Sequence, residues 1–460
     1  MKETMEAILP IPDSVREDVL AYRGRLLEKL TALEKGEINA ASLRAFRVPM
    51  GVYEQRIDGR FMVRVRIGAG LVLSRQMEVI AALSERYGNG ELHVTTRQDI
   101  QIHDVALEDT PDIFEDLLDA GLSSRGGGGN TVRNVSACPR AGRCPNERFN
   151  TAPHAIATAA YLLQHPSSFN LPRKYKIAFS GCGNDCALAC VADCGFFAQV
   201  RNGAQGFMVY AGGGLGPHPR GGIVIEEFIA MDQAPAMAEA VRRVFDQHGD
   251  RTNKHRARLR YVLERMGEEA FRAVCREQHA VVVREGLVGE PPVAPDLESR
   301  FSRDGEEGDL QCADFPTIPE TWKPLVLEEK NPRRATLRLP LPLGKIHADT
   351  LRAVARLAET HGLGLAVTTQ HQELLVPGLR REHLPEAMAM LRETGLHEYL
   401  SRRRPLLVTC AGASTCKLGV CLSRSLARAI DARLDERGFM ATSNTPVIRI
   451  SGCPNSCGGH

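Results

Sequence analysis

The chain has 460 residues, of which 43% are hydrophobic and 25% are charged, and its formal net charge is +2. These values are ordinary for a folded domain protein, and the small net charge argues against a general nucleic-acid binder. No apolar run approaches the roughly 18 residues of a membrane span, and the charged N-terminus lacks the apolar core of a signal peptide. We therefore expect a cytoplasmic protein with neither nucleic acid nor membrane as a partner.

The N-terminal part of the chain has a helical pattern followed by a strand, a helix and a strand pair. Apolar residues at helical spacing predict a helix over 13–35. Residues 61–70 alternate like a strand, 73–88 have a helical pattern closed by Gly88, and 92–105 alternate again. This order predicts a β-α-β unit preceded by a helical arm.

The same order of elements returns later in the chain. The patterns predict a strand over 335–344, a helix over 349–362 and a strand pair over 363–378. The triplet Val-Thr-Thr at 94–96 recurs at 367–369, an offset of 273 residues. The sequence therefore predicts two half ferredoxin-like units that pair into one domain.

Eight of the thirteen cysteines form one spacing pattern twice. In each half a pair separated by five residues precedes a pair separated by three, and counterparts lie 271 or 272 residues apart. The first set is Cys138, Cys144, Cys182 and Cys186, and the second set is Cys410, Cys416, Cys453 and Cys457. Four thiolates in two short loops are the ligands that one iron–sulfur cluster requires. The repeat predicts a duplicated redox protein.

Other interpretations of the cysteines compete with a cluster. Structural zinc uses cysteine pairs two to four residues apart, so the five-residue gap disfavours it. Four cysteines between 182 and 194 fall every four residues, as on one face of a helix. The first set is therefore either a second cluster site or a relic packed as small apolar residues. Cys275 and Cys312 have no partner at a ligand-like spacing, and we interpret them as incidental.

The second cysteine set resembles the signature of the siroheme-dependent sulfite and nitrite reductases. It stands in TCAGASTCKLG (409–419) followed by ISGCPNSCGG (450–459). The likeness covers about residues 48 to 460 and includes, in the family's order, FMVRVRIGAG (61–70), VTTRQDIQIH (94–103), VRNVSACP (132–139), LPRKYKIAF (171–179), AGGGLG (211–216) and DRTNKHRARLRYVLERMG (250–267). The resemblance implies siroheme and a [4Fe-4S] cluster as cofactors.

The resemblance also implies roles for individual residues. The catalytic set would line the distal face of the siroheme, hold the anion and supply protons; it consists of Arg66, Arg133, Lys174 and Lys176. The macrocycle would be bound by Arg97, Gln101, His103 and Asn134. Siroheme is rich in carboxylates, and burying such charge requires matched cations. Cys457 would ligate the cluster, with Cys410, Cys416 and Cys453, and bridge it to the siroheme iron. For Gln101 and His103, strand residues that merely face solvent remain the alternative.

The resemblance implies an α+β fold with an internal duplication. Two half ferredoxin-like units would pair into one domain, joined by two α/β siroheme- and cluster-binding domains. We expect a helical arm, a first half domain, a first cluster-type domain, a linker, a second half domain and a second cluster domain at 1–60, 61–130, 131–285, 286–333, 334–404 and 405–460. Only three residues follow Cys457, so we expect the second cluster domain to be incomplete and the chain to be a truncated member.

The implied activity is the six-electron reduction of sulfite to sulfide, with nitrite reduction to ammonia as the alternative. Sulfite is favoured because lysine stands at both 174 and 176, whereas nitrite reductases often have a neutral residue at the second position. An extra cation suits a dianion, since two charges 4 Å apart interact by about 4 kcal/mol at an effective dielectric near 20. An iron–sulfur electron-transfer protein without siroheme, or a zinc-stabilised protein, would not need the cation set.

The electrons must come from a partner protein. The glycine-rich segment at 211–217 fails the G-x-G-x-x-G pattern, because Pro217 stands where the last glycine belongs, and no P-loop occurs. We therefore expect no nicotinamide or ATP site, and a ferredoxin or a flavoprotein as the electron donor.

Overall fold

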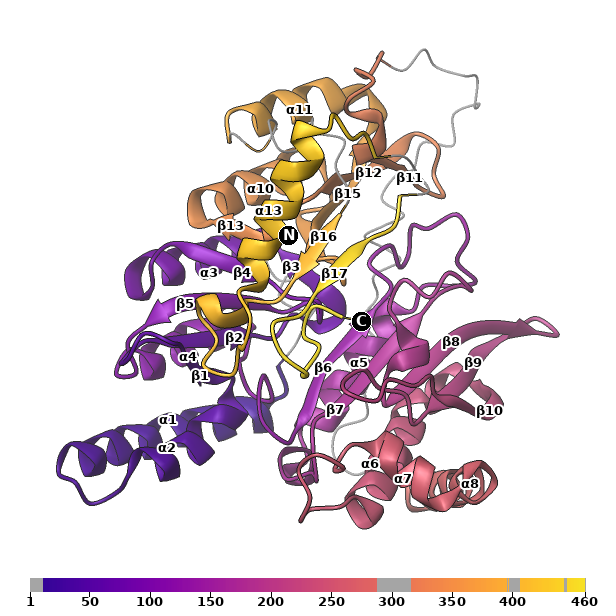
Figure 1. Cartoon of the computed structure of the whole chain (residues 1–460). Coiled ribbons are helices and arrows are strands. Elements are labelled where there is room, and N and C mark those ends of the chain that lie inside the picture. The colour runs from indigo at the N-terminus through magenta and orange to yellow at the C-terminus, as the bar shows by residue number, and fades with distance from the viewer. Residues whose placement is uncertain (1–10, 288–315, 395, 397–405, 442–444, 460) are drawn as a thin grey trace.

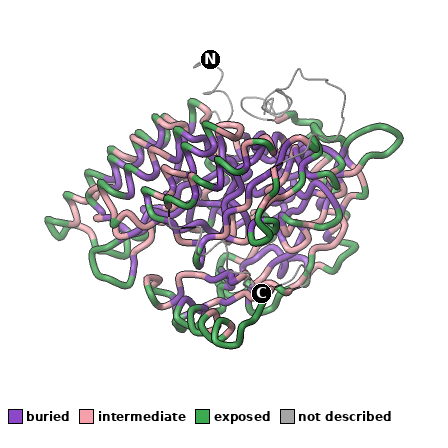
Figure 2. Tube along the Cα trace, turned by 90° about the horizontal axis from the view of Figure 1, so that it is seen from above, coloured by how far each residue is buried: buried purple, intermediate pink, exposed green. Residues whose placement is uncertain are grey.

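The computed structural model describes residues 11–287, 316–394, 396, 406–441 and 445–459 (Figure 1). Within these ranges the strands form three five-stranded sheets and one two-stranded sheet. Figure 2 shows the buried residues concentrated along the centre of the molecule, between exposed helices and loops. No helix in the described ranges is both long and apolar enough to cross a membrane.

The first half contains the predicted arm and β-α-β unit. In chain order its elements are α1 (Asp13–Glu34), α2 (Ala40–Arg47), β1 (Val52–Glu54), β2 (Phe61–Val65), β3 (Leu71–Leu73), α3 (Ser74–Tyr87), β4 (Glu91–Val94), β5 (Ile100–Val105) and α4 (Thr110–Asp119). The predicted helices over 13–35 and 73–88 are confirmed. In α1 the apolar face is buried through Val15, Val19 and Leu26, as helical spacing requires.

The second half repeats this order. Its elements are β11 (Val326–Glu328), β12 (Arg334–Leu339), β13 (Lys345–His347), α10 (Ala348–His361), β14 (Leu365–Thr368), β15 (Leu374–Arg380) and α11 (Leu384–Arg392). Strand β11 pairs with β12 and lies inside the segment predicted as linker, with Trp322 buried just before it. The folded second half therefore begins earlier than the linker prediction placed it. Residues 288–315 of that linker lie outside the described residues.

The two halves exchange a strand. The first sheet has the order β1-β2-β5-β4-β13 and the second has β11-β12-β15-β14-β3, so each half lends one short strand to the other. Gln98 and Gln372 reinforce this contact: Nε2 of Gln98 donates to the carbonyl of Thr368 at 2.8 Å, and Nε2 of Gln372 donates to that of Val94 at 3.1 Å. Pairing of the two half units into one domain is confirmed, with a pseudo-two-fold relation between them.

The third sheet carries the first cysteine set. Its elements are β6 (Val132–Ala137), α5 (Ala152–Leu163), β7 (Tyr175–Ser180), β8 (Cys194–Arg201), β9 (Ala204–Ala211), β10 (Ile223–Ala230), α6 (Ala234–His248), α7 (Leu259–Met266) and α8 (Glu268–Glu285). Strands β6, β7 and β8 run parallel, and β9 and β10 complete the sheet in antiparallel fashion. The rings of Phe179, Phe196 and Phe207 stack in its core.

The second cysteine set lies on a smaller unit of the same design. It consists of β16 (Leu407–Thr409), α13 (Ser423–Glu436) and β17 (Ile448–Ile450). Strands β16 and β17 pair in parallel, as β6 and β7 do in the first half. In Figure 1 this unit (yellow) descends from the second half domain, and the C-terminal end reaches β6 and β7 of the first half.

Candidate active site

The tight turn between β4 and β5 points an arginine at the third sheet. The hydroxyl of Thr95 accepts hydrogen bonds from the backbone N–H groups of Arg97 at 3.2 Å and Asp99 at 3.0 Å, which fixes the turn. The guanidinium of Arg97 donates to the backbone carbonyls of Asn134 at 2.5 Å and Ile177 at 3.1 Å. Arg97 therefore ties the first half domain to both β6 and β7.

Three further predicted residues surround this contact. Arg66, at the end of β2, donates to the carbonyl of Val132 at 2.9 Å and is buried. The side-chain amide of Asn134 donates to the carbonyl of Arg97 at 3.0 Å. Arg133, between Val132 and Asn134 on β6, is half-buried. The structure thus brings these side chains together from β2, the β4–β5 turn and β6.

The two predicted lysines lie at the start of β7. Lys176 is held by its backbone, whose N–H donates to the carboxylate of Asp193 at 2.8 Å. Asp193 is fully buried and forms an ion pair with Arg258, with the shortest N–O distance at 2.8 Å. Lys174 and Lys176 are half-buried, so both reach from the strand without being sealed inside the core. A buried ion pair therefore positions the lysine strand.

Cys457 of the second half reaches the cations of the first. Its backbone carbonyl accepts a hydrogen bond from the hydroxyl of Thr96 at 2.8 Å. A thiolate at Cys457 acts by charge on the guanidinium of Arg133 and the ammonium of Lys174, and raises the pKa of each. The Cys457 side chain is itself exposed. A composite site thus forms from residues more than 280 positions apart in sequence.

The site carries an excess of positive charge. Burial, together with mutual repulsion, lowers the pKa of Arg66 and Arg97 to about 10 each and that of Lys174 to about 8. The pKa of Lys176 falls well below its usual value, first through burial and then through repulsion by Lys174. The nearby carboxylate, Asp99, has a raised pKa because burial outweighs its cationic neighbours. Such a cluster is costly until an anion offsets it.

Unpartnered polar atoms show where such an anion fits. Among the described residues, the buried Nε of Arg97 and Oδ1 of Asn134 have no hydrogen-bond partner. A buried donor without a partner costs free energy, and a carboxylate would accept from the arginine. The donor set at this site therefore suits a group that carries several carboxylates, beside a thiolate that can ligate iron.

The second cysteine set forms a loop cluster at the end of β16 and β17. The Cys410 thiol accepts a hydrogen bond from the N–H of Gly452 at 3.1 Å. Burial raises the pKa of Cys416, and thiolates at Cys457 and Cys453 raise it further, so the thiols are neighbours. A zinc ion with four sulfur ligands at 2.3 Å holds them about 3.8 Å apart. In the described ranges no three cysteine sulfurs lie within 4.8 Å of one another, which leaves the spacing to a larger group.

Gln101 and His103 lie on one face of β5, and the solvent-facing interpretation of both is wrong. They are only 7% and 4% exposed. Nδ1 of His103 bonds to the side-chain oxygen of Gln55 at 2.9 Å, and Gln55 forms a β-bridge with Cys416. Burial and then the charge of Arg424 lower the pKa of His103 to about 3. Its buried Nε2 has no partner among the described residues. A macrocycle-binding role remains a prediction.

Cysteines 182 to 194 do not share a helix face, so that prediction is wrong. Cys182 and Cys186 flank a turn in which Asp185 has a left-handed backbone, with φ of 46°. The Asp185 carboxylate accepts a hydrogen bond from the N–H of Cys190 at 3.0 Å, which closes the turn. Cys194 begins β8 and is fully buried. The four thiols therefore separate into a turn pair and two others.

Some residues of the site escaped the sequence analysis. Tyr53 is near Arg133 and Arg64; burial raises its pKa, but these two cations reverse the shift and lower it. Its hydroxyl accepts from the N–H of Gly129 at 3.0 Å. Asp99 forms an ion pair with Arg64 at 3.7 Å. The internal repeat could have revealed Asp99, because an acidic residue, Glu373, stands at the same place in the second half.

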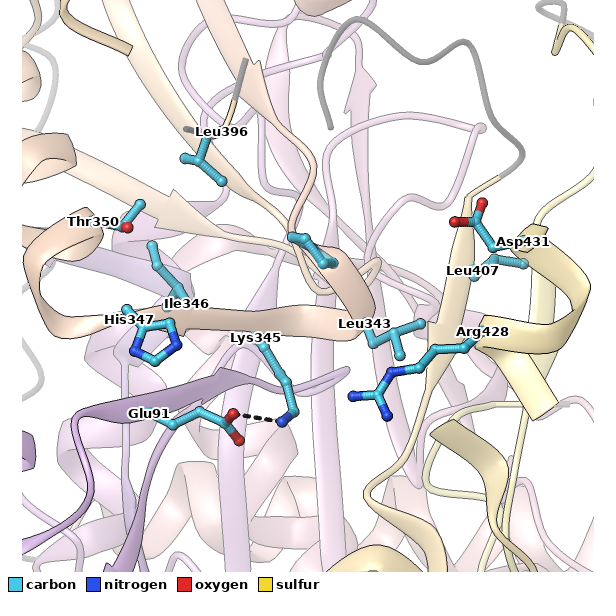
Figure 3. A pocket seen from close by; sticks show the side chains of 11 residues that line it. Glu91, Leu343, Lys345, Ile346, His347, Thr350, Leu396, Leu407, Arg428 and Asp431 are labelled. Atoms are coloured by element: carbon cyan, nitrogen blue, oxygen red, sulfur yellow. Dashed lines mark hydrogen bonds and ion pairs between the residues drawn. The ribbon is translucent and has the colours of Figure 1, made fainter. Parts of the chain in front are cut away.

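A cavity of about 390 Å³ lies elsewhere, where α13 meets the second half domain (Figure 3). Glu91 and Lys345 form an ion pair at 2.5 Å on one side, and Arg428 and Asp431 project from α13 on the other. None of the predicted site residues lines this cavity. It therefore does not mark the composite site.

Two family models match this chain. The ferredoxin-like half domain of nitrite and sulfite reductases matches residues 53–120 and 328–394, and the nitrite and sulphite reductase 4Fe-4S domain matches 128–282. Among solved structures, the NirA protein of Mycobacterium tuberculosis matches with a TM-score of 0.78 over 98% of this chain and 82% of that chain, at 23% identity. That structural likeness supports the fold.

Curated relatives match over most of the chain. A ferredoxin–nitrite reductase of Synechococcus elongatus is 30% identical over 427 residues, which is 89% of this chain and 76% of the relative. An assimilatory ferredoxin-dependent nitrite reductase of Haloferax mediterranei is 27% identical over 97% of this chain and 76% of the relative. Together with the cation cluster beside Cys457, these matches show that the chain belongs to the nitrite and sulfite reductase family, as an oxidoreductase that uses siroheme and a [4Fe-4S] cluster.

Proposed function

We propose that the protein reduces nitrite to ammonia with six electrons delivered by ferredoxin. The observation that carries this proposal is the approach of Cys457 to Arg133 and Lys174, which places an iron ligand beside anion-binding cations. Supporting it, relatives from a cyanobacterium, a plant and a haloarchaeon are all named ferredoxin-dependent nitrite reductases.

The second cysteine set supplies the cluster ligands in this proposal: Cys410, Cys416, Cys453 and Cys457. Siroheme, when bound, supplies the iron at which the substrate is reduced and the path by which electrons reach it. Arg66, Arg97 and Arg133 offset the carboxylates of the macrocycle through charge-assisted hydrogen bonds. The predicted catalytic role of Arg66 is weaker than that of the lysines, because its guanidinium already donates to two backbone carbonyls.

The lysines hold the substrate anion and supply protons. Lys174 has a pKa of about 8, close to the operating pH, which is the range in which a side chain donates protons most effectively. Oxygen leaves nitrite as water, so a proton donor at the substrate is required. Lys176, whose backbone is fixed by Asp193, lies two residues away on the same strand face.

The charge of the lysine pair favours nitrite over sulfite. Repulsion by Lys174 and burial hold the pKa of Lys176 well below its usual value, so the pair carries less than two positive charges near neutral pH. A monoanion matches such a pair better than a dianion does. Sulfite is the second candidate, because lysine at both 174 and 176 is the feature that favoured it in the sequence.

Steady-state kinetics with both anions tests this proposal. Reduced ferredoxin is the donor, and kcat/KM is measured for nitrite and for sulfite on the purified protein. We expect the value for nitrite to be at least about tenfold higher, a difference of about 1.4 kcal/mol in transition-state stabilisation. A preference for sulfite would overturn the proposal.

A Lys176→Asn variant separates the lysine argument from the rest. If Lys176 adds charge that sulfite needs, the variant loses sulfite turnover selectively and keeps nitrite turnover. Lys254→Asn, at an exposed position remote from the site in sequence, is the matched control and should change neither. An unchanged ratio in Lys176→Asn would mean that this lysine does not choose between the anions.

An electron-transfer protein without siroheme is the alternative from another class. It would need the cysteines but gain nothing from partly buried cations that repel one another. The lowered pKa values of Arg66, Arg97 and Lys174 record that cost. Siroheme content of the purified protein distinguishes the two, because only the reductase retains the macrocycle.

A further inference from the structure

The fold gathers four thiols of the first half in one place. Cys138 and Cys186 form a hydrogen bond between their side chains, and Cys144 acts by charge on both Cys138 and Cys182. Cys194, by contrast, bonds to Tyr175 in the core of the sheet. The structure thus selects the same four positions that the spacing repeat selects in the second half.

The backbone around the five-residue pair is the same in both halves. The N–H of Cys138 donates to the carbonyl of Phe179 at 2.9 Å, and that of Cys410 donates to Ile450 at 3.3 Å. The N–H of Cys144 donates to Arg140 at 2.9 Å, and that of Cys416 to Gly412 at 3.0 Å. Phe179 and Ile450, like Arg140 and Gly412, are counterparts in the repeat. Each loop therefore presents its two thiols from an equivalent frame.

The three-residue pairs also match. The N–H of Asp185 donates to the carbonyl of Cys182 at 3.4 Å, and that of Ser456 donates to Cys453 at 3.2 Å. Asp185 and Ser456 share a left-handed backbone, with φ of 46° and 53°. Non-glycine residues adopt this conformation rarely, so its recurrence at counterpart positions indicates a turn retained for the same purpose.

We propose that the first half binds a second [4Fe-4S] cluster, ligated by Cys138, Cys144, Cys182 and Cys186. The cluster is distinct from the one at the composite site and does not depend on the proposed substrate. It exchanges single electrons, as such clusters do.

The charges around the first set suit an anionic cluster. Arg140 acts on the Cys186 thiolate and lowers its pKa, and Arg143, buried on the same loop, senses the charge of Cys138. A hydrogen bond from Cys138 contributes most to lowering the pKa of Cys186, to about 7. Thiolate, not thiol, is the form that ligates iron. A relic packed as small apolar residues would need neither these cations nor the exposed position of Cys186.

Zinc and a second siroheme fit this region less well. As in the second set, no three sulfurs of the described cysteines approach within 4.8 Å, so the spacing is wider than that around one zinc ion. The cations that would accompany a macrocycle are not repeated: the counterparts of Arg66, Lys174 and Lys176 are Pro340, Thr445 and Val447. The cysteines are duplicated and these three cations are not, which favours a cluster alone.

Iron and acid-labile sulfide counts test the proposal. The full chain is purified and reconstituted without oxygen, with ferrous iron and sulfide, and its metals and sulfide are quantified. We expect about eight irons and eight sulfides per chain, from two four-iron clusters. Four irons per chain, or zinc in place of four of them, would overturn the proposal.

Paired variants assign the counts to each half. Cys138→Ala combined with Cys182→Ala should remove four irons, and Cys410→Ala combined with Cys453→Ala should remove the other four. Cys275→Ala, a buried cysteine outside both sets, is the control and should keep all eight. An undiminished count in the first double variant would contradict the ligand assignment.

Spin counting gives an answer that does not depend on how the variants fold. In the wild-type protein, reduced with dithionite and free of siroheme, we expect about two cluster spins per chain by electron paramagnetic resonance. One spin would overturn the second cluster while leaving the proposed reductase intact. Two spins without nitrite turnover would overturn the proposed function and keep the cluster.

Discussion

The two halves of the molecule share a framework but divide the chemistry. Gln98 and Gln372 occupy equivalent left-handed turns, and each accepts a hydrogen bond from a cluster-domain backbone, from Ala137 at 3.0 Å and from Thr409 at 2.8 Å. The cation set stands only in the first half, whereas Cys457 comes from the second. Duplication therefore preserved the turns and loops that hold the architecture, while one site was assembled from complementary remnants of both halves.

The strand exchange explains why such a division is stable. β3 and β13 cross between the half sheets, so neither half closes its sheet alone. The halves are thereby held in one relative position, and Cys457 meets Arg133 and Lys174 without a dedicated linker. Breaking one half should damage the composite site as a whole.

Loss of Cys457 should have the largest effect on that comparison. Cys457→Ser removes the thiolate that the second half contributes, and we expect activity to fall by at least about 100-fold together with siroheme content. Cys421→Ser, also exposed and on the same unit, is the control and should retain both. Full activity in Cys457→Ser, measured with ferredoxin and nitrite, would show that the second half supplies no essential ligand.

The contribution of the first half is tested by its lysines. Lys174→Met keeps the length of the side chain but removes its charge and proton, and we expect kcat to fall by roughly 100- to 1,000-fold, as for loss of one charge-stabilising donor. Lys254→Met is the control at an exposed position. If kcat is retained and only KM rises, Lys174 binds the anion without delivering protons.

The shared framework is tested by removing its two glutamines separately. Gln98→Ala and Gln372→Ala each leave buried backbone groups unpaired, and we expect a loss of about 2–4 kcal/mol in the free energy of unfolding, similar for both. Urea denaturation measures it, and Gln205→Ala on an exposed strand end should cost less than about 0.5 kcal/mol. A large loss in one variant alone would contradict equivalent roles.

The smallest effect is a pH dependence confined to the first half. In the protein without siroheme, the pKa of Lys174 is about 8, against the usual 10.5, mainly because of burial. Between these values the unfolded chain binds more protons than the folded one, so the free energy of unfolding should rise with pH over that window. We expect Lys174→Met to reduce this rise between pH 8 and 10 in urea titrations. An identical slope in variant and wild type would contradict the shift.

Local patterns predicted the elements, and the repeat predicted their pairing. The apolar spacing of α1 and α3 and the closing glycines at 88 and 362 located the helices correctly. The exchange of β3 and β13 could not be predicted, because each strand has only three residues and the pairing joins segments more than 250 residues apart. Strand partners at that distance are set by tertiary contacts rather than by local preference.

The site was predicted mainly by resemblance, and its supporting contacts were not. Arg66, Arg97, Arg133 and Lys174 come together, but the buried pair of Asp193 and Arg258 left no periodic signal. The four-residue spacing of the cysteines misled, because the Asp185 side chain closes a turn where a helix would otherwise run. Side-chain to backbone bonds of this kind compete with helix formation.

The composite nature of the site is tested most directly by siroheme bound to the purified protein. Siroheme is extracted and quantified from the wild type, from Cys457→Ser and from the double variant Arg97→Met/Arg133→Met, after anaerobic purification. If both halves hold one macrocycle, the wild type contains about one siroheme per chain and both variants lose most of it. Full siroheme content in either variant would show that one half binds the macrocycle alone and would contradict the account.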